Sequence, residues 1–196
     1  MTAFPPQPSG TLVVLVVCTG NICRSPAAEL LLRARLGACS GIVVASAGTA
    51  ARVGEGVAAP MTRLLRERGL EPDGFAARQL VDGLVSAADV VLTMTAAQRS
   101  SVVSAVPAAL RRTFTLRELA GLAAVVGPEL EPGDPAARLA ALVRAAPRGR
   151  GHRQTGPEHD DVADPYRGPD AGYASSLRAI EAAVDALSVV LVDRTH

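Results

Sequence analysis

The sequence predicts an α/β fold in which a parallel sheet is covered by helices on both faces. Its apolar runs are continuous and rich in β-branched residues, a pattern typical of strands that are buried on both sides. These runs alternate along the chain with segments of helical spacing, as βαβ units do. Hydrophobic residues make up 48% of the 196 residues, which is enough for one sizeable core. Right-handed crossovers would place helices on both faces of the sheet.

The first predicted strand, residues 12–17, runs directly into a loop and then into a helix. The strand is an unbroken series of leucines and valines. Ser25 can cap the helix that follows, Pro26 suits its first helical position, and Gly37 would end it. The loop of residues 18–24 therefore lies between a strand and a helix without any linker.

The same alternation continues through the chain. We expect strands at residues 42–45, 89–94 and 113–116, and helices at residues 60–68, 81–87 and 96–105. A last helix at residues 173–192 has apolar residues at helical spacing, so one of its faces should pack on the sheet.

Two segments depart from this pattern. Residues 1–10 are rich in proline and are expected to form a flexible tail. Between residues 127 and 161, Pro, Gly, Arg and His dominate, which predicts a surface insertion in a single domain of residues 11–194. Two interpretations of this insertion stay open, a solvated mobile loop or a segment with one short helix at residues 136–144.

The composition indicates the cellular compartment and excludes some classes of partner. The formal net charge of +1 gives no electrostatic argument for nucleic acid or an anionic membrane as a partner. Three cysteines do not make a disulfide framework, which favours a reducing compartment. The start of the chain lacks the pattern of a secretory signal, and the apolar run at residues 12–17 is too short to span a bilayer. We therefore expect a cytoplasmic protein.

Cys18 and Arg24 are separated by five residues between the first strand and the first helix. Amide groups of such a loop converge on one small space, and the helix dipole adds positive potential there, so the loop can hold an anion such as phosphate. The intervening residues would supply these amides: Thr19, Gly20, Asn21, Ile22 and Cys23. Arg24 can direct two donors onto two phosphate oxygens.

Cys18 would lie at the bottom of this loop as the nucleophile. The field that holds a phosphate dianion also stabilises a thiolate, and a thiolate facing phosphorus can attack it to form a phosphocysteine. The alternative is a buried structural cysteine at the end of a strand, because free cysteines are often buried. The spacing to Arg24 and the Ser25-Pro26 helix start favour the catalytic interpretation.

Asp164 is the candidate general acid. Pro165 follows it and stiffens the backbone in an extended form, which can hold a carboxyl group over the loop. This group would protonate the leaving oxygen and later deprotonate the attacking water. Asp160 and Asp161 are the alternative acids, and a simple Asp-Pro turn is the alternative without a catalytic role.

Several segments resemble the low-molecular-weight protein tyrosine phosphatases, in particular their bacterial members. Residues 17–26, which contain Cys18 and Arg24, are similar to the signature loop of that family, and Asp164-Pro165-Tyr166 is similar to its catalytic-acid motif. Residues 46–49, 77–80 and 89–94 resemble further family segments. The likeness covers about residues 12–116 and 160–190. It implies a flavodoxin-like three-layer sandwich with a four-stranded parallel sheet.

The resemblance also implies supporting roles near the loop. Asn21, Ser25 and Ser46 would form a polar shell that holds the loop, with the Ser25 hydroxyl donating to Cys18; local turn or capping bonds are the alternative. Cys23 could form a reversible disulfide with Cys18, as this position can in the family, or could be a small packing residue. Cys39 is interpreted as structural.

The resemblance implies hydrolysis of phosphomonoesters without a metal. His152, His159 and His196 do not have the spacing of metal ligands, so we expect neither a metal nor another cofactor.

Substrate preference depends on the side chains around the expected phosphate pocket. We place Arg52 and Tyr166 at the rim of this pocket and Ile22 in its wall. Tyr166 could stack on an aryl group. Ile22 stands where phosphoarginine phosphatases of the family have Thr, which favours a flat aryl ester. The expected partner is a phosphotyrosine-bearing protein, for example a bacterial tyrosine kinase.

Three alternatives stay open. They are a phosphoarginine phosphatase, a non-catalytic phosphoprotein-binding module, and a thiol-linked arsenate reductase. The last needs resolving cysteines after the third strand, and residues 93–116 contain none.

Overall fold

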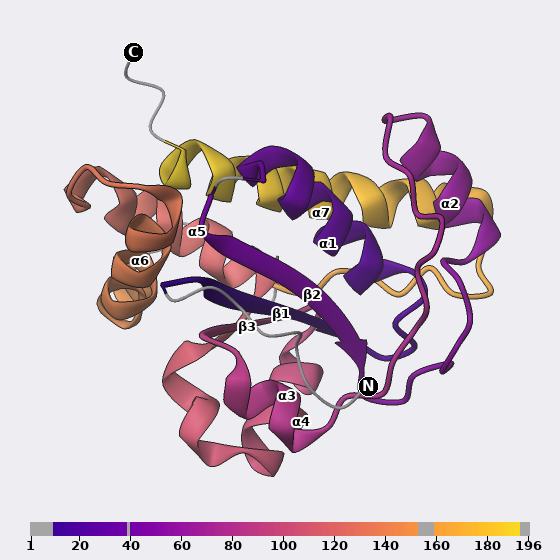
Figure 1. Ribbon diagram of the computed structural model, residues 1–196, viewed down its shortest axis with the longest axis horizontal. Helices are drawn as coiled ribbons and strands as arrows, with labels where there is room; N and C mark the ends of the chain where they lie inside the picture. Colours follow the sequence, from indigo (N-terminus) through magenta and orange to yellow (C-terminus); the bar gives the residue numbers. More distant parts are fainter. Residues whose placement is uncertain (1–9, 39, 153–158, 193–196) are drawn as a thin grey trace.

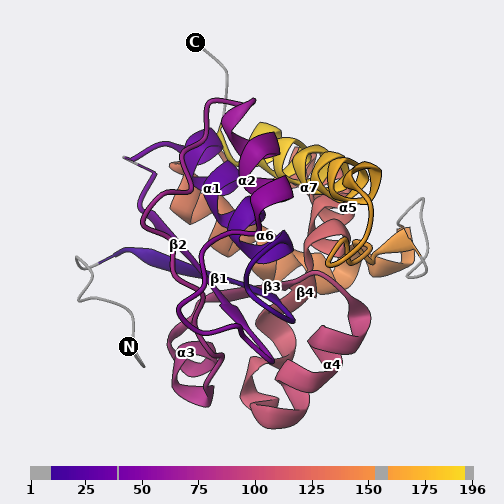
Figure 2. The same ribbon diagram turned by 90° about the vertical axis from the view of Figure 1, so that its right-hand side faces the viewer.

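The computed structural model describes residues 10–38, 40–152 and 159–192. Its centre is a parallel sheet of four strands in the order β2-β1-β3-β4 (Figure 1; all four strands are labelled in Figure 2). The strands are β1 (Leu12–Cys18), β2 (Ile42–Gly48), β3 (Val90–Thr93) and β4 (Thr113–Thr115). The predicted α/β class with a four-stranded parallel sheet is confirmed. The predicted tail at residues 1–10, apart from Gly10, lies outside the described residues, as do Cys39 and His196.

Strand β1 lies in the middle of the sheet and directs alternate side chains to opposite faces. Val14 and Val16 belong to the larger core cluster, whereas Val13, Leu15 and Val17 belong to the smaller one. Both faces of β1 are therefore buried, which explains why its sequence is continuously apolar rather than alternating. In the register of the sheet, Cys18 pairs with Gly48 and Val17 with Thr93, so these three strands end at the same edge.

Helices cover both faces of the sheet, as Figures 1 and 2 show. The larger cluster joins one face to α1 (Arg24–Leu36), α2 (Ala59–Arg66), α5 (Leu116–Val126) and α7 (Asp170–Leu191). The smaller cluster joins the other face to α3 (Asp82–Ala87) and α4 (Ala96–Ala105). In the described parts of the chain, no helix combines the length and apolar character needed to cross a membrane.

Helix α5 is an element that our sequence analysis did not include. It begins directly after β4. There the Thr115 hydroxyl accepts a hydrogen bond from the Glu118 amide, and the Glu118 carboxylate accepts one from the Thr115 amide. This capping box is readable in the sequence as Thr-x-x-Glu before an apolar run. Leu119, Leu122 and Val126 then lie in the larger core cluster.

The predicted insertion contains a longer and more deeply packed helix than expected. Helix α6 (Pro135–Gly149) extends past both ends of the predicted helix at residues 136–144. Asp134 caps it by accepting from the Ala137 amide at 2.8 Å. Leu139, Leu142 and Ala146 lie in the larger core cluster, so the interpretation as a solvated mobile loop is wrong for this stretch. The 3₁₀ helices η1 (Pro107–Arg112), η2 (Gly127–Glu129) and η3 (Arg150–His152) complete the described elements.

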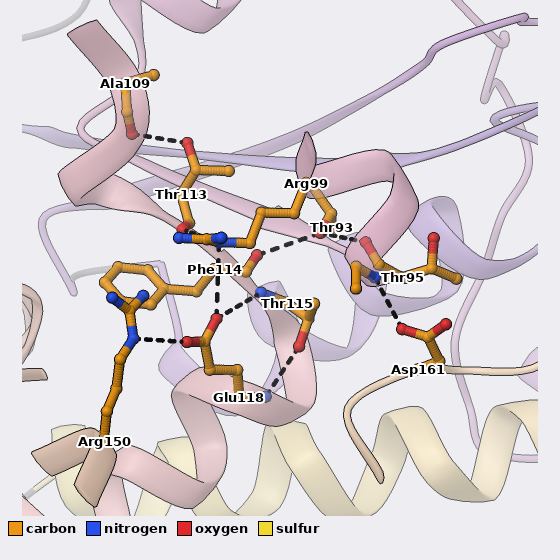
Figure 3. A network of polar contacts seen from close by, with 11 residues as sticks. Thr93, Thr95, Arg99, Ala109, Thr113, Phe114, Thr115, Glu118, Arg150 and Asp161 are labelled. Carbon is orange, nitrogen blue, oxygen red and sulfur yellow. Dashed lines mark hydrogen bonds and ion pairs between the residues drawn. The ribbon is translucent and has the colours of Figure 1, made fainter. Parts of the chain in front are cut away.

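A polar network at the carboxyl ends of β3 and β4 fixes the neighbouring helices (Figure 3). Glu118 accepts from Arg150 Nε at 2.9 Å, and Arg99 Nε donates to the Thr113 carbonyl at 2.8 Å. Asp161 Oδ1 accepts from the first amide of α4, that of Ala96, at 2.7 Å. Through this last bond, the segment that leads to Asp164 is attached to α4.

Candidate active site

The loop between β1 and α1, residues 18–24, is called the Cys18 loop below. Cys18 is 2% exposed, and its Sγ atom lies 3.0 Å from the Ser25 hydroxyl and 3.3 Å from the Asn21 amide nitrogen, which donates to it. The thiol therefore lies at the floor of a pocket with two hydrogen-bonding neighbours. The pocket is lined by Cys18, Thr19, Gly20, Ile22, Cys23, Arg24, Ala50, Arg52, Asp164 and Tyr166.

The carbonyl groups of the Cys18 loop point away from this pocket. They accept hydrogen bonds of 2.8–3.0 Å from backbone amides of the segment 49–58; the pairs are Thr49 to Cys18, Ala50 to Thr19, Arg52 to Gly20 and Ala58 to Ile22. Because the C=O and N–H of a trans peptide point in opposite directions, the next amides face the pocket. Within the described chain, the amides of Thr19, Gly20 and Cys23 donate to no protein group. They are free to bind a tetrahedral anion.

Gly48 allows the loop to approach β2 this closely. A Cβ atom on Gly48 would lie 2.4 Å from the Thr19 carbonyl oxygen and 3.0 Å from the Asn21 Cβ. Asn21 itself has a φ of 55°, in the left-handed region that asparagine tolerates better than most residues. The tight turn of the loop thus depends on Gly48 and Asn21. Only the structure shows why these two residue types are required there.

The Asn21 side chain holds the loop in place. Its Nδ2 atom donates to the hydroxyls of Ser25 at 2.9 Å and Ser46 at 2.8 Å, and its Oδ1 atom accepts from the Arg78 amide at 2.9 Å. The structure therefore brings together the three residues that were expected to form the polar shell. Since Ser25 also contacts Cys18, these bonds connect the floor of the pocket to β2.

Three residues that the sequence analysis did not place in the site extend this shell. The buried carboxylate of Glu29 accepts from Ser46 Oγ at 2.6 Å, and Arg78 Nε donates to the Ser46 carbonyl at 2.7 Å. On the other side, Gln98 Nε2 donates to Thr19 Oγ1 at 3.0 Å. Arg78 lies in the segment 77–80 that resembles a family segment, whereas no motif in the sequence marks Glu29 or Gln98, which act through tertiary contacts.

One N–H group of the Arg24 guanidinium has no hydrogen-bond acceptor among the described residues. The residue is 3% exposed; one terminal nitrogen donates to the Val162 carbonyl at 3.1 Å and the other to Asp164 Oδ2 at 2.5 Å. Its Nε atom is buried without a partner among the described residues. A buried donor without an acceptor costs about 1–3 kcal/mol.

Of the three candidate acids, only Asp164 lines the pocket. Its side chain is 49% exposed, and its Oδ1 atom accepts from the Tyr166 amide at 3.2 Å. Asp161 caps α4 instead, and Asp160 is buried at 4% exposure. The geometry thus separates carboxylates that are adjacent in the sequence.

Cys23 lies beside Cys18 but in a different electrostatic setting. Burial, followed by the negative charges of Cys18 and Asp164, raises the pKa of the Cys23 thiol to about 12. Its thiol also lies within hydrogen-bonding reach of the Tyr173 hydroxyl. At neutral pH, Cys23 therefore stays protonated and is a poor nucleophile.

The rim of the pocket brings together the residues predicted for it. The Arg52 guanidinium lies 5.6 Å from the centre of the Tyr166 ring, and Ala50 lines the same side. Ile22 is 4% exposed and forms an apolar part of the wall.

This fold and this pocket define a class of protein, the phosphatases that use a cysteine and an arginine on one anion-binding loop. Residues 13–132 match the family described as low molecular weight phosphotyrosine protein phosphatase. The chain belongs to this family, and the resemblance seen in its motifs is confirmed. It is accordingly a cysteine-dependent phosphatase.

Relatives of this chain include phosphatases of two substrate types. A probable low molecular weight protein-tyrosine-phosphatase, EpsP of Ralstonia nicotianae, is 31% identical over 88% of this chain and 91% of the relative. A protein-arginine-phosphatase of Geobacillus stearothermophilus is 29% identical over 89% of this chain and 93% of the relative.

Solved structures show the same fold. The low molecular weight protein tyrosine phosphatase from T. tengcongensis has a TM-score of 0.67 at 27% identity, covering 90% of this chain and 97% of that one. The YwlE arginine phosphatase from Geobacillus stearothermophilus has a TM-score of 0.65 at 29% identity, covering 90% of each chain. These similarities confirm the flavodoxin-like α/β arrangement.

Proposed function

We propose that this phosphatase hydrolyses phosphotyrosine in proteins, with Cys18 as nucleophile, Arg24 as phosphate ligand and Asp164 as general acid and base. One observation carries the assignment of roles. Cys18, Arg24 and Asp164 line a single pocket at the start of α1. Relatives named as protein-tyrosine-phosphatases support the substrate.

In the first step, the phosphoryl group lies in the Cys18 loop. Its oxygens accept from the free amides of Thr19, Gly20 and Cys23 and from Arg24, whose hydrogen bond to Asp164 opens when phosphate binds. The Cys18 thiolate attacks phosphorus in line, so that a P–S bond forms while the P–O bond to the leaving group breaks. Protonated Asp164 gives its proton to the departing oxygen.

In the second step, the same groups act in reverse order. The Asp164 carboxylate takes a proton from water, and the oxygen of this water attacks phosphorus while the P–S bond breaks. The Cys18 sulfur leaves as a thiolate, which accepts hydrogen bonds from the Ser25 hydroxyl and the Asn21 amide. Inorganic phosphate is then released, and the enzyme returns to its starting state.

A second candidate substrate is phosphoarginine, because a protein-arginine-phosphatase is among the relatives. The wall of the pocket favours the aryl ester. Ile22 presents an apolar side chain to the pocket, and Tyr166 presents an aromatic ring at its rim. Both surfaces suit the flat face of a tyrosine ring better than a charged guanidinium.

The test is a comparison of kcat/KM for phosphotyrosine, phosphoserine and phosphoarginine forms of one peptide. We expect phosphotyrosine to be the best substrate by at least about tenfold. A higher kcat/KM for phosphoarginine would replace the tyrosine assignment by the second candidate. Turnover should need no added metal and should be inhibited by vanadate.

We further propose that residues 11–194 act as one domain and that the enzyme works in the cytoplasm on a phosphotyrosine-bearing protein such as a bacterial tyrosine kinase. The single-domain interpretation is supported by one core cluster that contains both Val14 of β1 and Leu191 of α7. Release of phosphate from an autophosphorylated tyrosine kinase, measured with and without the enzyme, tests the partner.

A further inference from the structure

A strained arginine lies next to Tyr166, a residue of the pocket rim. Residues 165–168 form a turn in which the Gly168 amide donates to the Pro165 carbonyl at 2.8 Å. Arg167, the third residue of this turn, has a φ of 61°, in the left-handed region. Turns of this kind usually have Gly or Asn at that position, because a larger side chain is unfavourable there. An arginine held in this conformation beside an active site is therefore a candidate for a functional role.

Arg167 contributes to a group of cations around Tyr166. Its guanidinium lies 5.3 Å from the centre of the Tyr166 ring, and that of Arg52 lies 5.6 Å from the same ring. Both distances are within the range of cation–π contacts. Tyr166 and Arg52 also line the pocket that contains Cys18, and Arg167 adjoins this mouth through its contact with the Tyr166 ring.

The charges of these arginines are compensated to different degrees. Arg52 Nε donates to Glu55 Oε2 at 2.7 Å, and Arg24 is paired with Asp164. Arg167 is exposed and makes no ion pair with any residue in the ranges that the structure describes. The Tyr166 side of the mouth therefore has an uncompensated positive charge.

We propose that Arg167, with Arg52 as a second and weaker contact, selects phosphotyrosine segments that have Asp or Glu next to the phosphotyrosine. This inference rests on the proposed function. A phosphotyrosine whose phosphate lies over Cys18 places its ring beside Tyr166, and its sequence neighbours, about 3.8 Å away per residue, over the rim. A carboxylate there meets Arg167 without having to displace another carboxylate, whereas at Arg52 it competes with Glu55.

The experiment compares two phosphotyrosine peptides that differ only in having Glu or Gln on both sides of the phosphotyrosine. For each protein the measured quantity is the ratio of kcat/KM for the Glu peptide to that for the Gln peptide, so a general loss of activity cancels. In the wild type we expect a ratio of about 3 to 5 at low salt, falling as salt is added. Arg167→Gln should bring the ratio close to one, and Arg52→Gln should lower it less.

Arg111→Gln is the matched control. This exposed arginine of η1 precedes β4, at the opposite edge of the sheet from the pocket, and its substitution removes the same charge. Its ratio should equal that of the wild type. Arg167→Gly separates the charge from the turn, because glycine suits the left-handed conformation better than arginine. If Arg167 were only a turn residue, Arg167→Gly would keep the wild-type ratio, and that result would overturn the proposal.

A binding measurement keeps this inference separate from the proposed function. Non-hydrolysable phosphonate analogues of the two peptides are titrated into Cys18→Ser and into Cys18→Ser with Arg167→Gln. Tighter binding of the Glu analogue that is lost with Arg167 supports the rim assignment, even if phosphotyrosine proves to be a poor substrate. Equal binding of both analogues to Cys18→Ser, or an equal kcat/KM for both peptides in the wild type, would overturn it.

Discussion

The Cys18 loop and the segment of residues 160–168, called the Asp164 loop here, meet at one pocket but are built in opposite ways. In the Cys18 loop, Cys18, Asn21 and Arg24 are at most 3% exposed, and hydrogen bonds to β2 and the segment 49–58 fix the backbone. In the Asp164 loop the side chain of Asp164 is 49% exposed. It reaches the pocket from a position 140 residues along the chain from Arg24.

This difference corresponds to what each region has to do. The anion-binding loop works best when its donors are already in position, because no reorganisation is then needed during the reaction. In the proposed mechanism the Asp164 carboxylate moves between Arg24, the leaving oxygen and water. The base of its loop is fixed, because the Val162 amide donates to the Met94 carbonyl at 2.8 Å and Asp161 caps α4, and Arg24 donates to the Val162 carbonyl and to Asp164 itself.

The largest effect is expected from Cys18→Ser, which removes the nucleophile from the rigid region. A serine hydroxyl is a far weaker nucleophile here, so kcat for p-nitrophenyl phosphate should fall about 10⁴-fold or more. Circular dichroism should show an intact fold. Hydrolysis at the wild-type rate would exclude Cys18 from the mechanism.

The second effect concerns the adjustable region. Asp164→Asn should lower kcat by about 10²–10⁴-fold, as expected for loss of a general acid, and most strongly for substrates with basic leaving groups. Binding of inorganic phosphate should be retained or tightened, because Arg24 no longer has a carboxylate partner. Asp161→Asn is the matched control from the same loop and should retain most of the activity. If both variants had the same activity, the assignment of Asp164 as the acid would be wrong.

A third prediction tests how rigid the Cys18 loop must be. Gly48→Ala should displace the loop, because its new methyl group would lie 2.4 Å from the Thr19 carbonyl oxygen. We expect a loss of about 1–3 kcal/mol in the free energy of unfolding, together with weaker phosphate binding. Gly56→Ala is the control, since its nearest neighbour would be at 4.0 Å and its φ is not positive. Both effects can be followed by urea unfolding and by phosphate titration.

The smallest effect is a pH dependence of stability that comes from Cys23. With a pKa raised from 9.0 to about 12, the folded protein keeps the thiol proton in a range where the unfolded chain loses it. The contribution of the Cys23 thiol to the free energy of unfolding is therefore fully present below about pH 9. It is lost as the pH rises towards 12. Between pH 8 and 10.5 the wild type should lose about 1–2 kcal/mol more than Cys23→Ala in urea unfolding. Equal losses would contradict this assignment.

The sequence was sufficient to predict those elements whose signals are local. The strand at residues 12–17 and the helix at 96–105 were predicted from apolar runs, caps and breakers, and β1 and α4 agree with them. The helix predicted after Ser25 is present, but α1 begins at Arg24 with Cys23 at its N-cap, so the prediction of Ser25 as the cap was wrong. Helix α5 was missed, although Thr115 and Glu118 provide a capping signal. Helix α6 was underestimated because Pro, Gly and Arg are frequent in the surrounding segment 127–161, while its apolar residues at 139, 142 and 146 lie on one buried side.

Of the site, the sequence by itself determined the Cys18 loop, because the Cys18 to Arg24 spacing and the Ser25-Pro26 helix start are consequences of neighbouring residues. Only the tertiary structure shows which of the three candidate carboxylates lines the pocket and which polar residues contact the Cys18 loop. Glu29, Arg78 and Gln98 reach the loop through long-range contacts, and Asp164 meets Arg24 only after the sheet and α7 have formed. Such contacts have no local signal, since they depend on how strands and helices pack rather than on the residues beside them.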